Sequence, residues 1–389
     1  MQLPAPDKHA LEHSQRLCNR IREEIRLNNG YIDFSTFMNM AMYEPGLGYY
    51  SSGTRKLGVG GDFITAPEIS TLFSRCLARQ VMEILNTLEK PCVLEFGPGS
   101  GKMCCDLLLA LEQNECLPDK YLLLELSADL RERQTRLIET RIPHLAKLVT
   151  WLDTLPDRDF SGVILANEVL DAMPVHRFIM RAGVPFEYGV AFTDGKFDWH
   201  ISEPVDSFKQ LVYERLDQNI DYLPSGYTTE INDQILPWLK SIEDNLEQGV
   251  LLLIDYGYPR HEYYHPQRTD GTLLCHYRHL VHNDPFFYPG LQDITASVDF
   301  TAVAEAAVST GLQVAGYTTQ AHFLMGCGLA ELMQSTGASS VAESVELSNQ
   351  ARLLTMPGEM GERFKVIALA KQLDMSMAGF RYLDLRSRL

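Results

Sequence analysis

The sequence predicts an α/β fold built around a mainly parallel sheet. Three observations favour this class. Short apolar runs alternate with helical segments from residue 91 onward, a glycine-rich turn joins the first run to a helix, and acidic or amide side chains follow several runs. Parallel strands that are buried on both faces have near-continuous apolar sequences, and ligands of such sheets bind beyond the carboxyl ends of the strands.

The organising stretch is P-C-V-L-E-F-G-P-G-S-G-K-M at residues 91–103. It predicts a buried strand, a turn containing Gly97, Gly99 and Gly101, and the start of a helix. The spacing G-x-G-x-G differs from the dinucleotide spacing G-x-G-x-x-G. Glu95 precedes the turn, and its carboxylate suits a ligand with an amino group. The combination is similar to the first motif of class I methyltransferases, although a plain connecting turn would share the glycines.

The N-terminal region is predicted to be helical. Apolar residues recur at helical spacing over residues 9–28, and Asp33 or Ser35 caps a second helix. A long loop rich in glycine and aromatic residues follows. Thr65 and Glu68 then fit a capping box, which opens a helix that runs to about residue 88.

Seven apolar segments are predicted as strands of the core, and helical segments separate most of them. The first five are at 92–96, 120–126, 147–152, 162–167 and 249–255, and the last two are at 312–318 and 364–370. The interval between the fourth and fifth strands is too long for one helix and predicts an insertion. The predicted regions are 1–88 (helical lid and substrate region), 89–177 (first part of the core), 178–247 (insertion) and 248–389 (second part of the core, with a His/Tyr-rich loop at 258–299).

Polar residues occupy the predicted strand ends. Glu125 lies 24 residues beyond Gly101, close to the offset expected for an acid that holds ribose hydroxyls. Asp153, Asn167 and Asp255 end or follow the third, fourth and fifth strands. Together they predict one nucleoside-type ligand across the carboxyl edge of the sheet.

The overall composition limits the classes of binding partner and the cellular compartment that are expected. The chain has 389 residues and a net charge of −17, which argues against nucleic acid as the main partner and favours a basic substrate. Its eight cysteines form no C-x-x-C pair, as in proteins of reducing compartments. The N-terminus lacks the pattern of a signal or transit peptide, and no apolar run is long enough to span a bilayer. A cytoplasmic protein without a membrane span is therefore expected.

Several longer segments resemble the MidA/NDUFAF7 family of S-adenosylmethionine-dependent methyltransferases. They are M-Y-E-P-G-L-G-Y-Y, G-D-F-I-T-A-P-E-I-S, L-E-F-G-P-G-S-G-K-M, A-N-E-V-L-D-A-M-P-V-H-R-F, L-L-I-D-Y-G-Y, D-G-T-L-L-C-H-Y-R-H and G-L-Q-D-I-T-A-S-V-D-F-T. They span nearly the whole chain in order. One position departs, since Ser297 stands where many relatives carry His. The resemblance implies a seven-stranded class I (Rossmann-like) core, a helical N-terminal addition and an inserted substrate subdomain.

The resemblance also implies roles for the residues at the strand ends. S-adenosylmethionine is the implied cofactor, with Glu95 at its amino group, Glu125 at the ribose hydroxyls and Asp153 near the adenine. The residues expected to contact it are Glu95, Gly97, Gly99, Gly101, Glu125, Asp153, Asn167, Thr65 and Pro67. The capping role of Thr65 competes with this binding role.

The implied reaction is methylation of an accessible arginine in a protein substrate, which for the mitochondrial member of the family is a subunit of respiratory complex I. Asn167 and Glu168 would face the methyl group, and Glu168 or Asp171 would grip the guanidinium. The competing interpretation of Asp171 is a cap on a helix after the fourth strand. Second choices for the grip are Asp62, Glu68 and Asp255. The N-P-P-Y motif of many amino-group methyltransferases is absent, since N-E-V-L takes its place.

Other residues have competing interpretations. His176 is a candidate general base or a structural residue. His276, His279 and His282 recur at every third position, but no further ligand pattern completes a metal site, so no metal is expected. The aromatic residues Tyr43, Tyr49, Tyr50 and Phe63 are expected to line a substrate channel or to pack the N-terminal helices.

Two other functions stay open at this point. The chain could keep the cofactor fold and act as a catalytically silent assembly or scaffold factor. A nicotinamide oxidoreductase is the remaining alternative, which the G-x-G-x-G spacing disfavours. Whether the protein forms a homodimer is left open by the sequence.

Overall fold

The computed structural model describes residues 3–51, 65–156, 159–216, 222–335 and 340–389. Two compact units divide the chain, and each is built from three separate segments. The first unit comprises residues 1–63, 171–235 and 258–302, and the second comprises residues 64–170, 236–257 and 303–389. Within the described parts of the chain, no helix has both the length and the apolar character needed to cross a membrane.

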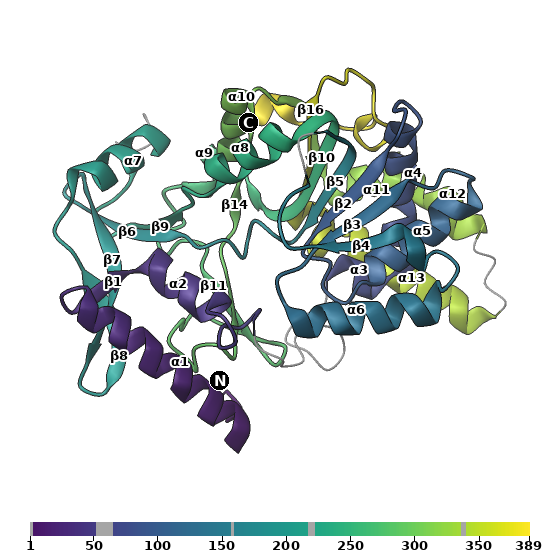
Figure 1. The fold of residues 1–389 in the computed structure, drawn as a ribbon. Coiled ribbons are helices and arrows are strands. Elements are labelled where there is room, and N and C mark those ends of the chain that lie inside the picture. The colour runs from purple at the N-terminus through teal and green to yellow at the C-terminus, as the bar shows by residue number, and fades with distance from the viewer. Residues whose placement is uncertain (1–2, 52–64, 157–158, 217–221, 336–339) are drawn as a thin grey trace. The chain divides into compact units, whose positions relative to one another are not determined.

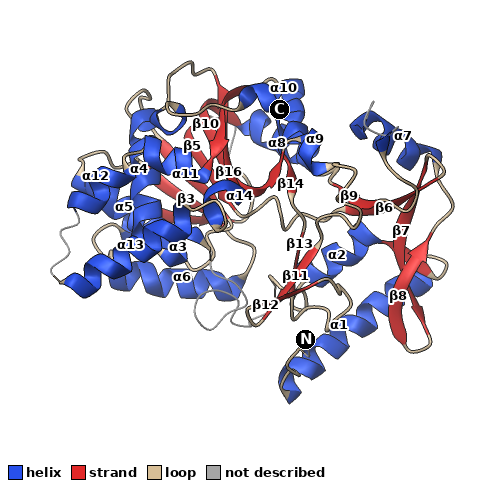
Figure 2. Ribbon diagram, turned by 180° about the vertical axis from the view of Figure 1, so that it is seen from behind, coloured by secondary structure: helices blue, strands red, loops and turns tan. Residues whose placement is uncertain are grey.

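The second unit is the predicted α/β core. Its mainly parallel sheet has the strand order β15-β16-β10-β5-β2-β3-β4, and β16 is antiparallel to both of its neighbours. Figure 2 shows helices, in blue, around the red strands of this sheet. The strands are β2 (Cys92–Phe96), β3 (Lys120–Leu124), β4 (Val149–Leu152), β5 (Phe160–Asn167), β10 (Leu246–Tyr258), β15 (Gln313–Thr319) and β16 (Phe364–Lys371).

Helices and one extended apolar cluster complete this core. Buried residues from the sheet, such as Val93 and Leu252, pack with Leu77, Leu108 and Phe323 from helices. The helices are α3 (Ala66–Ile69), α4 (Thr71–Leu85), α5 (Lys102–Gln113), α6 (Ala128–Arg141), α8 (Ile235–Asn245), α10 (Phe300–Thr310), α11 (Gln320–Gly326), α12 (Leu329–Ser335), α13 (Val341–Thr355) and α14 (Met360–Arg363), with 3-10 turns at Ala146–Leu148, Ala378–Phe380 and Arg386–Arg388.

The first unit combines the N-terminal helices with two small sheets. One sheet has the order β1-β7-β6-β9 with β8 paired to β7, and the other has the order β12-β11-β13. Figure 1 labels most of these elements, and Figure 2 also labels β12 and β13. The elements are α1 (Lys8–Leu27), β1 (Tyr31–Asp33), α2 (Phe34–Tyr43), β6 (His176–Arg181), β7 (Val184–Thr193), β8 (Lys196–Ile201), α7 (Asp206–Leu216), β9 (Thr228–Ile231), α9 (Arg260–Tyr263), β11 (Leu274–Tyr277), β12 (Leu280–His282), β13 (Asp293–Thr295) and β14 (Val298–Asp299).

Most predicted elements are confirmed, but the boundaries of the compact units differ from the predicted regions. Residues 65–88 belong to the core unit and not to a lid, because α4 packs into the apolar cluster of the core. The stretch at 258–299 is not an irregular loop of the core, since it contains several short strands and lies in the first unit.

The helix predicted from residue 65 to 88 is wrong as a continuous element. Ser70 has extended backbone angles, φ −154° and ψ 142°, which end α3 and begin α4. Its hydroxyl accepts a hydrogen bond from the backbone N–H of Leu72, so Ser70 is the true cap of the long helix. Thr65 makes no side-chain capping bond.

Candidate functional site

The order of the core strands creates a topological switch point, which is the place where consecutive strands leave the starting strand in opposite directions. The chain runs from β2 outward to β3 and β4, then returns to β5 on the other side of β2. Phe96 of β2 is paired with Ala166 of β5, so Gly97 and Asn167 leave the sheet at the same edge. Ligands of open α/β sheets bind in the crevice at such a point.

The glycine turn adopts the backbone conformation that the sequence predicts. Gly97, Gly99 and Gly101 have φ values of +56°, +55° and +83°, in the left-handed region that favours glycine. A Cβ atom on Gly101 would also lie 3.2 Å from Cγ of Gln134. Gly101 is the N-cap of α5, so the turn delivers the free N–H groups of a helix start to this edge.

Gln134 fastens the glycine turn to the second strand, and sequence reasoning missed it. It is fully buried on α6, and its Nε2 donates to Gly99 O (2.9 Å) and to Glu125 Oε2 (3.2 Å). Its Oε1 accepts from Trp151 Nε1 at 2.8 Å. A glutamine within a helix carries no local motif, and only the fold brings it between these partners.

A Gln134→Ala variant is expected to bind the implied cofactor at least about 10-fold more weakly, because its hydrogen bonds to Gly99, Glu125 and Trp151 are lost. We also expect a loss of about 2–4 kcal/mol in the free energy of unfolding, from the cavity and the unpaired partners. Isothermal titration with S-adenosylhomocysteine and denaturant unfolding test both values. Gln113→Ala, at the exposed end of α5, is the matched control. Unchanged affinity in Gln134→Ala would contradict the fastening role.

Glu95 lies within β2 and is only 1% exposed. Its Oε2 accepts a hydrogen bond from the Tyr121 hydroxyl at 2.6 Å. Burial, with a further contribution from the charge of Glu125, outweighs this hydrogen bond and raises the pKa of Glu95 to about 7. A buried carboxylate of this kind gains from a cationic ligand, because an opposite charge favours its ionised form.

Glu125 and Asp153 differ in how firmly they are held. Glu125 is buried, and its Oε1 accepts from the backbone N–H of Ser127 at 2.8 Å. Asp153 has an 88% exposed side chain and pairs with Arg131 at 2.8 Å. Arg131 also donates to the carbonyl oxygens of Glu125 and Leu152, which ties the ends of β3 and β4 together. Of the two acids, Glu125 is the better fixed ligand.

The predicted capping box is replaced by contacts to the glycine turn. Glu68 Oε1 accepts a hydrogen bond from the hydroxyl of Ser100 instead of capping a helix. Lys102 donates to the carbonyl oxygen of Pro67 and pairs with Asp106 at 2.8 Å. Pro67 and Glu68 of α3 therefore contact Lys102 and Ser100, while the binding roles of Thr65 and Pro67 stay predictions. Asp62 lies outside the described residues.

Asn167 and Glu168 follow the switch-point end of β5. Nδ2 of Asn167 donates to Glu168 Oε1 at 3.1 Å, while its buried Oδ1 accepts no hydrogen bond from any described residue. Glu168 has φ +55°, a conformation that non-glycine residues rarely adopt. Its N–H donates to Ile254 O at 2.9 Å. Such strain persists only where the surroundings enforce it, and it is common at functional sites.

Asp255 enforces the path of this loop. It is 1% exposed, and its Oδ2 accepts from the backbone N–H of Leu170 at 3.0 Å. Its Oδ1 accepts from the N–H of Tyr256 at 2.8 Å. We therefore assign Asp255 a positioning role for the loop that contains Glu168. These backbone bonds compete with the substrate contact that the sequence left open for it.

Comparisons with known proteins agree with this geometry. Residues 76–318 match a family model described as an S-adenosyl-L-methionine-dependent methyltransferase. The chain belongs to this family. A crystal structure of a Burkholderia thailandensis protein bound to S-adenosyl-homocysteine is 40% identical, with a TM-score of 0.94 over 100% of both chains. The arginine methyltransferase NDUFAF7 of Homo sapiens is 26% identical over 88% of this chain and 80% of its own length, and the Drosophila melanogaster homologue is 27% identical over 91% and 84%.

The chain is thus a methyltransferase with S-adenosylmethionine as its cofactor. The predicted family, the Rossmann-like α/β class of the fold and the cofactor are confirmed, whereas the number of seven core strands stays a prediction. The residues at the switch point fit the group. Among the described residues, no lysine or arginine forms an ion pair with the buried carboxylate of Glu95, and no donor reaches Oδ1 of Asn167. The glycine turn presents backbone in the left-handed conformation at this edge.

Asp171 belongs to the first unit of the methyltransferase and is 5% exposed. The predicted helix after β5 is absent, since the next described element is β6, so Asp171 caps no helix. Burial is the main cause that raises the pKa values of Tyr43 and Tyr50, and the charge of Asp171 is among the smaller contributions to both.

The aromatic residues near α2 mostly pack against one another. The rings of Tyr43 and Tyr50 stack at 5.7 Å, and Tyr49 contacts Tyr50 edge-on at 5.1 Å. The hydroxyl of Tyr43 donates to Ala172 O, and that of Tyr50 donates to Asp293 Oδ1. These contacts favour the packing interpretation for the three tyrosines. Phe63 lies outside the described residues.

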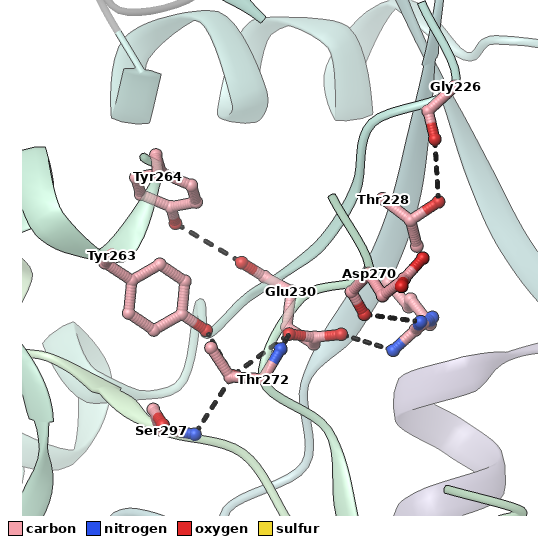
Figure 3. A network of polar contacts seen from close by, with 9 residues as sticks. Gly226, Thr228, Glu230, Tyr263, Tyr264, Asp270, Thr272 and Ser297 are labelled. Atoms are coloured by element: carbon pink, nitrogen blue, oxygen red, sulfur yellow. Dashed lines mark hydrogen bonds and ion pairs between the residues drawn. The ribbon is translucent and has the colours of Figure 1, made fainter. Parts of the chain in front are cut away.

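Ser297 lies at the edge of a buried polar network. Figure 3 shows its N–H pointing to Thr272, whose hydroxyl oxygen accepts at 3.1 Å. Thr272 donates from its backbone N–H to Glu230 Oε2 at 2.7 Å, and Glu230 is paired with Arg177. Because the backbone of Ser297 makes this contact, the network does not depend on its side chain.

The histidines singled out in the sequence differ in the direction of their pKa shifts. Hydrogen bonds to Asp233 and Glu187 outweigh burial and raise the pKa of His176 to about 10, so its ring is protonated at neutral pH and is a poor base. Burial lowers the pKa values of His276 and His282. Among the described residues, the three loop histidines belong to no group with metal-binding geometry.

Proposed function

We propose that this methyltransferase transfers the methyl group to an arginine side chain of a protein substrate. The observation that carries the proposal is Glu168, a carboxylate held in a strained conformation directly after β5, at the switch point of a family shown to use S-adenosylmethionine. The names of the animal relatives, protein arginine methyltransferases, support the same acceptor. The net charge of −17 favours attraction of a basic segment.

Different residues of the core unit would hold different parts of the cofactor. When bound, the cofactor supplies a methyl group attached to a sulfonium. Glu95 would hold the amino group, and Glu125 would accept hydrogen bonds from the ribose hydroxyls. Leu126, which is 77% exposed beside Glu125, offers an apolar surface to the adenine. The N–H groups at the start of α5 and the glycine turn would line the methionine part.

The carboxylate of Glu168 would activate and orient an arginine acceptor, which is a weak nucleophile. A guanidinium is essentially always protonated, so its nitrogen is a weak nucleophile. A carboxylate that grips the planar fork fixes its orientation and offsets the charge that develops on the attacked nitrogen. Asp171 stays the alternative acid that the sequence predicts for this role. Fixed orientation alone can contribute about 7–11 kcal/mol to such a displacement.

The test uses methyl-labelled S-adenosylmethionine, the purified protein and a lysate from cells that lack the gene. After incubation, the proteins are separated, hydrolysed and analysed for labelled amino acids. We expect labelled methylarginine in one or a few bands. Label on lysine, histidine or a terminal amine, or in nucleic acid, would overturn the arginine proposal and keep the methyltransferase. Cofactor binding without any label would favour the scaffold function.

Location and assembly remain part of the proposal. The animal relatives are named as mitochondrial proteins, whereas the sequence predicts a cytoplasmic protein. A respiratory-complex subunit as substrate and a homodimer are likewise predictions. The labelled bands would identify the protein substrate, and sedimentation of the purified chain tests whether it forms a homodimer.

A further inference from the structure

A cluster of side chains in the first unit shares no residue with the set assigned to cofactor binding. Asp33, His176 and Glu187 each offer one ligand atom, and these atoms all lie within 4.8 Å of one another. Nδ1 of His176 is 2.6 Å from Glu187 Oε1. The side chains of His176 and Glu187 are 19% and 17% exposed, so the cluster is half-buried yet open to an ion from solvent.

Three neighbouring strands bring these residues together. Asp33 ends β1 and is paired with Gly189 of β7, which also carries Glu187. His176 begins β6, next to the pairing of Arg177 with Tyr188. A Cβ atom on Gly189 would lie 2.6 Å from the Ile32 carbonyl oxygen, so glycine is what lets β1 approach closely enough for Asp33 to reach the other two.

The cluster has more negative charge than its surroundings balance. Asp233 adds a third carboxylate, with Oδ2 at 3.4 Å from Nε2 of His176. Among the described residues, no lysine or arginine forms an ion pair with Asp33, Glu187 or Asp233. Three carboxylates therefore face a single imidazole. Even in its protonated form, the ring leaves a net charge of about −2, which a divalent cation would neutralise.

We propose that Asp33, His176 and Glu187 bind a divalent transition-metal ion, with Asp233 as the partner of the second ring nitrogen. One imidazole nitrogen and two carboxylate oxygens form a ligand set suited to Zn²⁺ or Mn²⁺, and water completes the coordination. Histidine ligands almost always donate their other N–H to a carboxylate, and Asp233 lies where that bond requires it. The ion takes the place of the proton on Nδ1.

The ligand distances are within reach of such a site. Bonds of about 2.0–2.2 Å separate neighbouring ligand atoms by roughly 3.3–3.5 Å, so the side chains need to move by about 1 Å. Asp33 Oδ1 and Oδ2 accept hydrogen bonds from the N–H and hydroxyl of Thr36 at 2.7 and 2.8 Å. These bonds fix the carboxylate, and each oxygen keeps a second lone pair for the ion.

The experiment measures zinc binding to the purified full chain after treatment with a chelator. We expect one equivalent of Zn²⁺ to be lost in Glu187→Gln. Asp233→Asn, which keeps all three ligands, should weaken zinc binding by about 10- to 100-fold, as outer-shell substitutions do. Asp198→Asn removes an exposed carboxylate from the same sheet and should bind zinc like the wild type.

Two further measurements make the outcome decisive. Circular dichroism and thermal unfolding of each variant report whether it is folded. The spectrum of bound Co²⁺ reports the ligand type, and we expect no thiolate charge-transfer band. Equal zinc content in wild type and Glu187→Gln, or a thiolate band that assigns the ion to one of the eight free cysteines, would overturn the proposal. If Glu187→Gln does not fold, unchanged zinc affinity in Asp233→Asn overturns it.

Discussion

Glu168→Gln is expected to slow methyl transfer by about 10²- to 10³-fold, the usual cost of removing one preorganised charged or polar group at a reacting centre. Glutamine has nearly the same shape as glutamate but carries no charge, so it cannot offset the charge on an attacked guanidinium. The affinity for S-adenosylhomocysteine should change by no more than a few-fold, because other residues are assigned to hold the cofactor. Rates with labelled cofactor and isothermal titration measure the two quantities.

Glu115→Gln is a close control for this variant. Glu115 is an exposed glutamate with φ +54°, nearly the value of Glu168, but it follows α5 far from the switch point in sequence. The substitution should leave the rate unchanged. If Glu168→Gln keeps full activity, the carboxylate does not grip the acceptor, and if it loses cofactor binding in equal measure, its role is structural.

Glu95→Gln is expected to stabilise the cofactor-free protein at alkaline pH. The folded-state pKa of Glu95 is about 7, against an ordinary value of 4.5. Between these values the folded chain keeps a proton that the unfolded chain has released, so stability falls as pH rises and stays lower above pH 7. The difference corresponds to about 3 kcal/mol. Denaturant unfolding at pH 4.5 and pH 8 should show this fall in the wild type and lose most of it in the variant.

The same substitution should weaken cofactor binding. A charge-assisted hydrogen bond to the amino group of the cofactor is worth about 1.5–3 kcal/mol, so the affinity for S-adenosylhomocysteine should drop by about 10- to 100-fold. In the wild type, that affinity should rise as pH increases through about 7, since the carboxylate must be ionised. A pH-independent affinity in the wild type would show that Glu95 is not the partner of the ammonium.

The parts of the fold that sequence predicts well are those written in local pattern. The strands of the core are short apolar runs, and their predicted positions are close to the observed ones. The glycines at 97, 99 and 101 adopt positive φ values that other residues rarely adopt, so the turn was also predicted correctly. The helix break at Ser70 was missed because apolar residues continue at helical spacing across it. A serine that caps from an extended conformation leaves little trace in periodicity.

The remainder depends on contacts between distant segments. Gln134 reaches Gly99 only because α6 packs beside the glycine turn, and Asp33 reaches His176 only because β1 joins the sheet of β6 and β7. The division of the chain at 170 and 258 also follows from packing and not from a linker composition. No local pattern carries such information.

The place of β16 constrains how this chain can be made. The last strand of the sequence lies in the interior of the sheet, between β10 and β15, and not at its edge. Until residues 364–371 have left the ribosome, β10 and β15 present unpaired edges to each other and to other nascent chains. Folding of the core is therefore late and dominated by non-local contacts, which makes it slow and dependent on protection from aggregation. Loss of the C-terminal segment would leave an open gap between β10 and the edge strand β15.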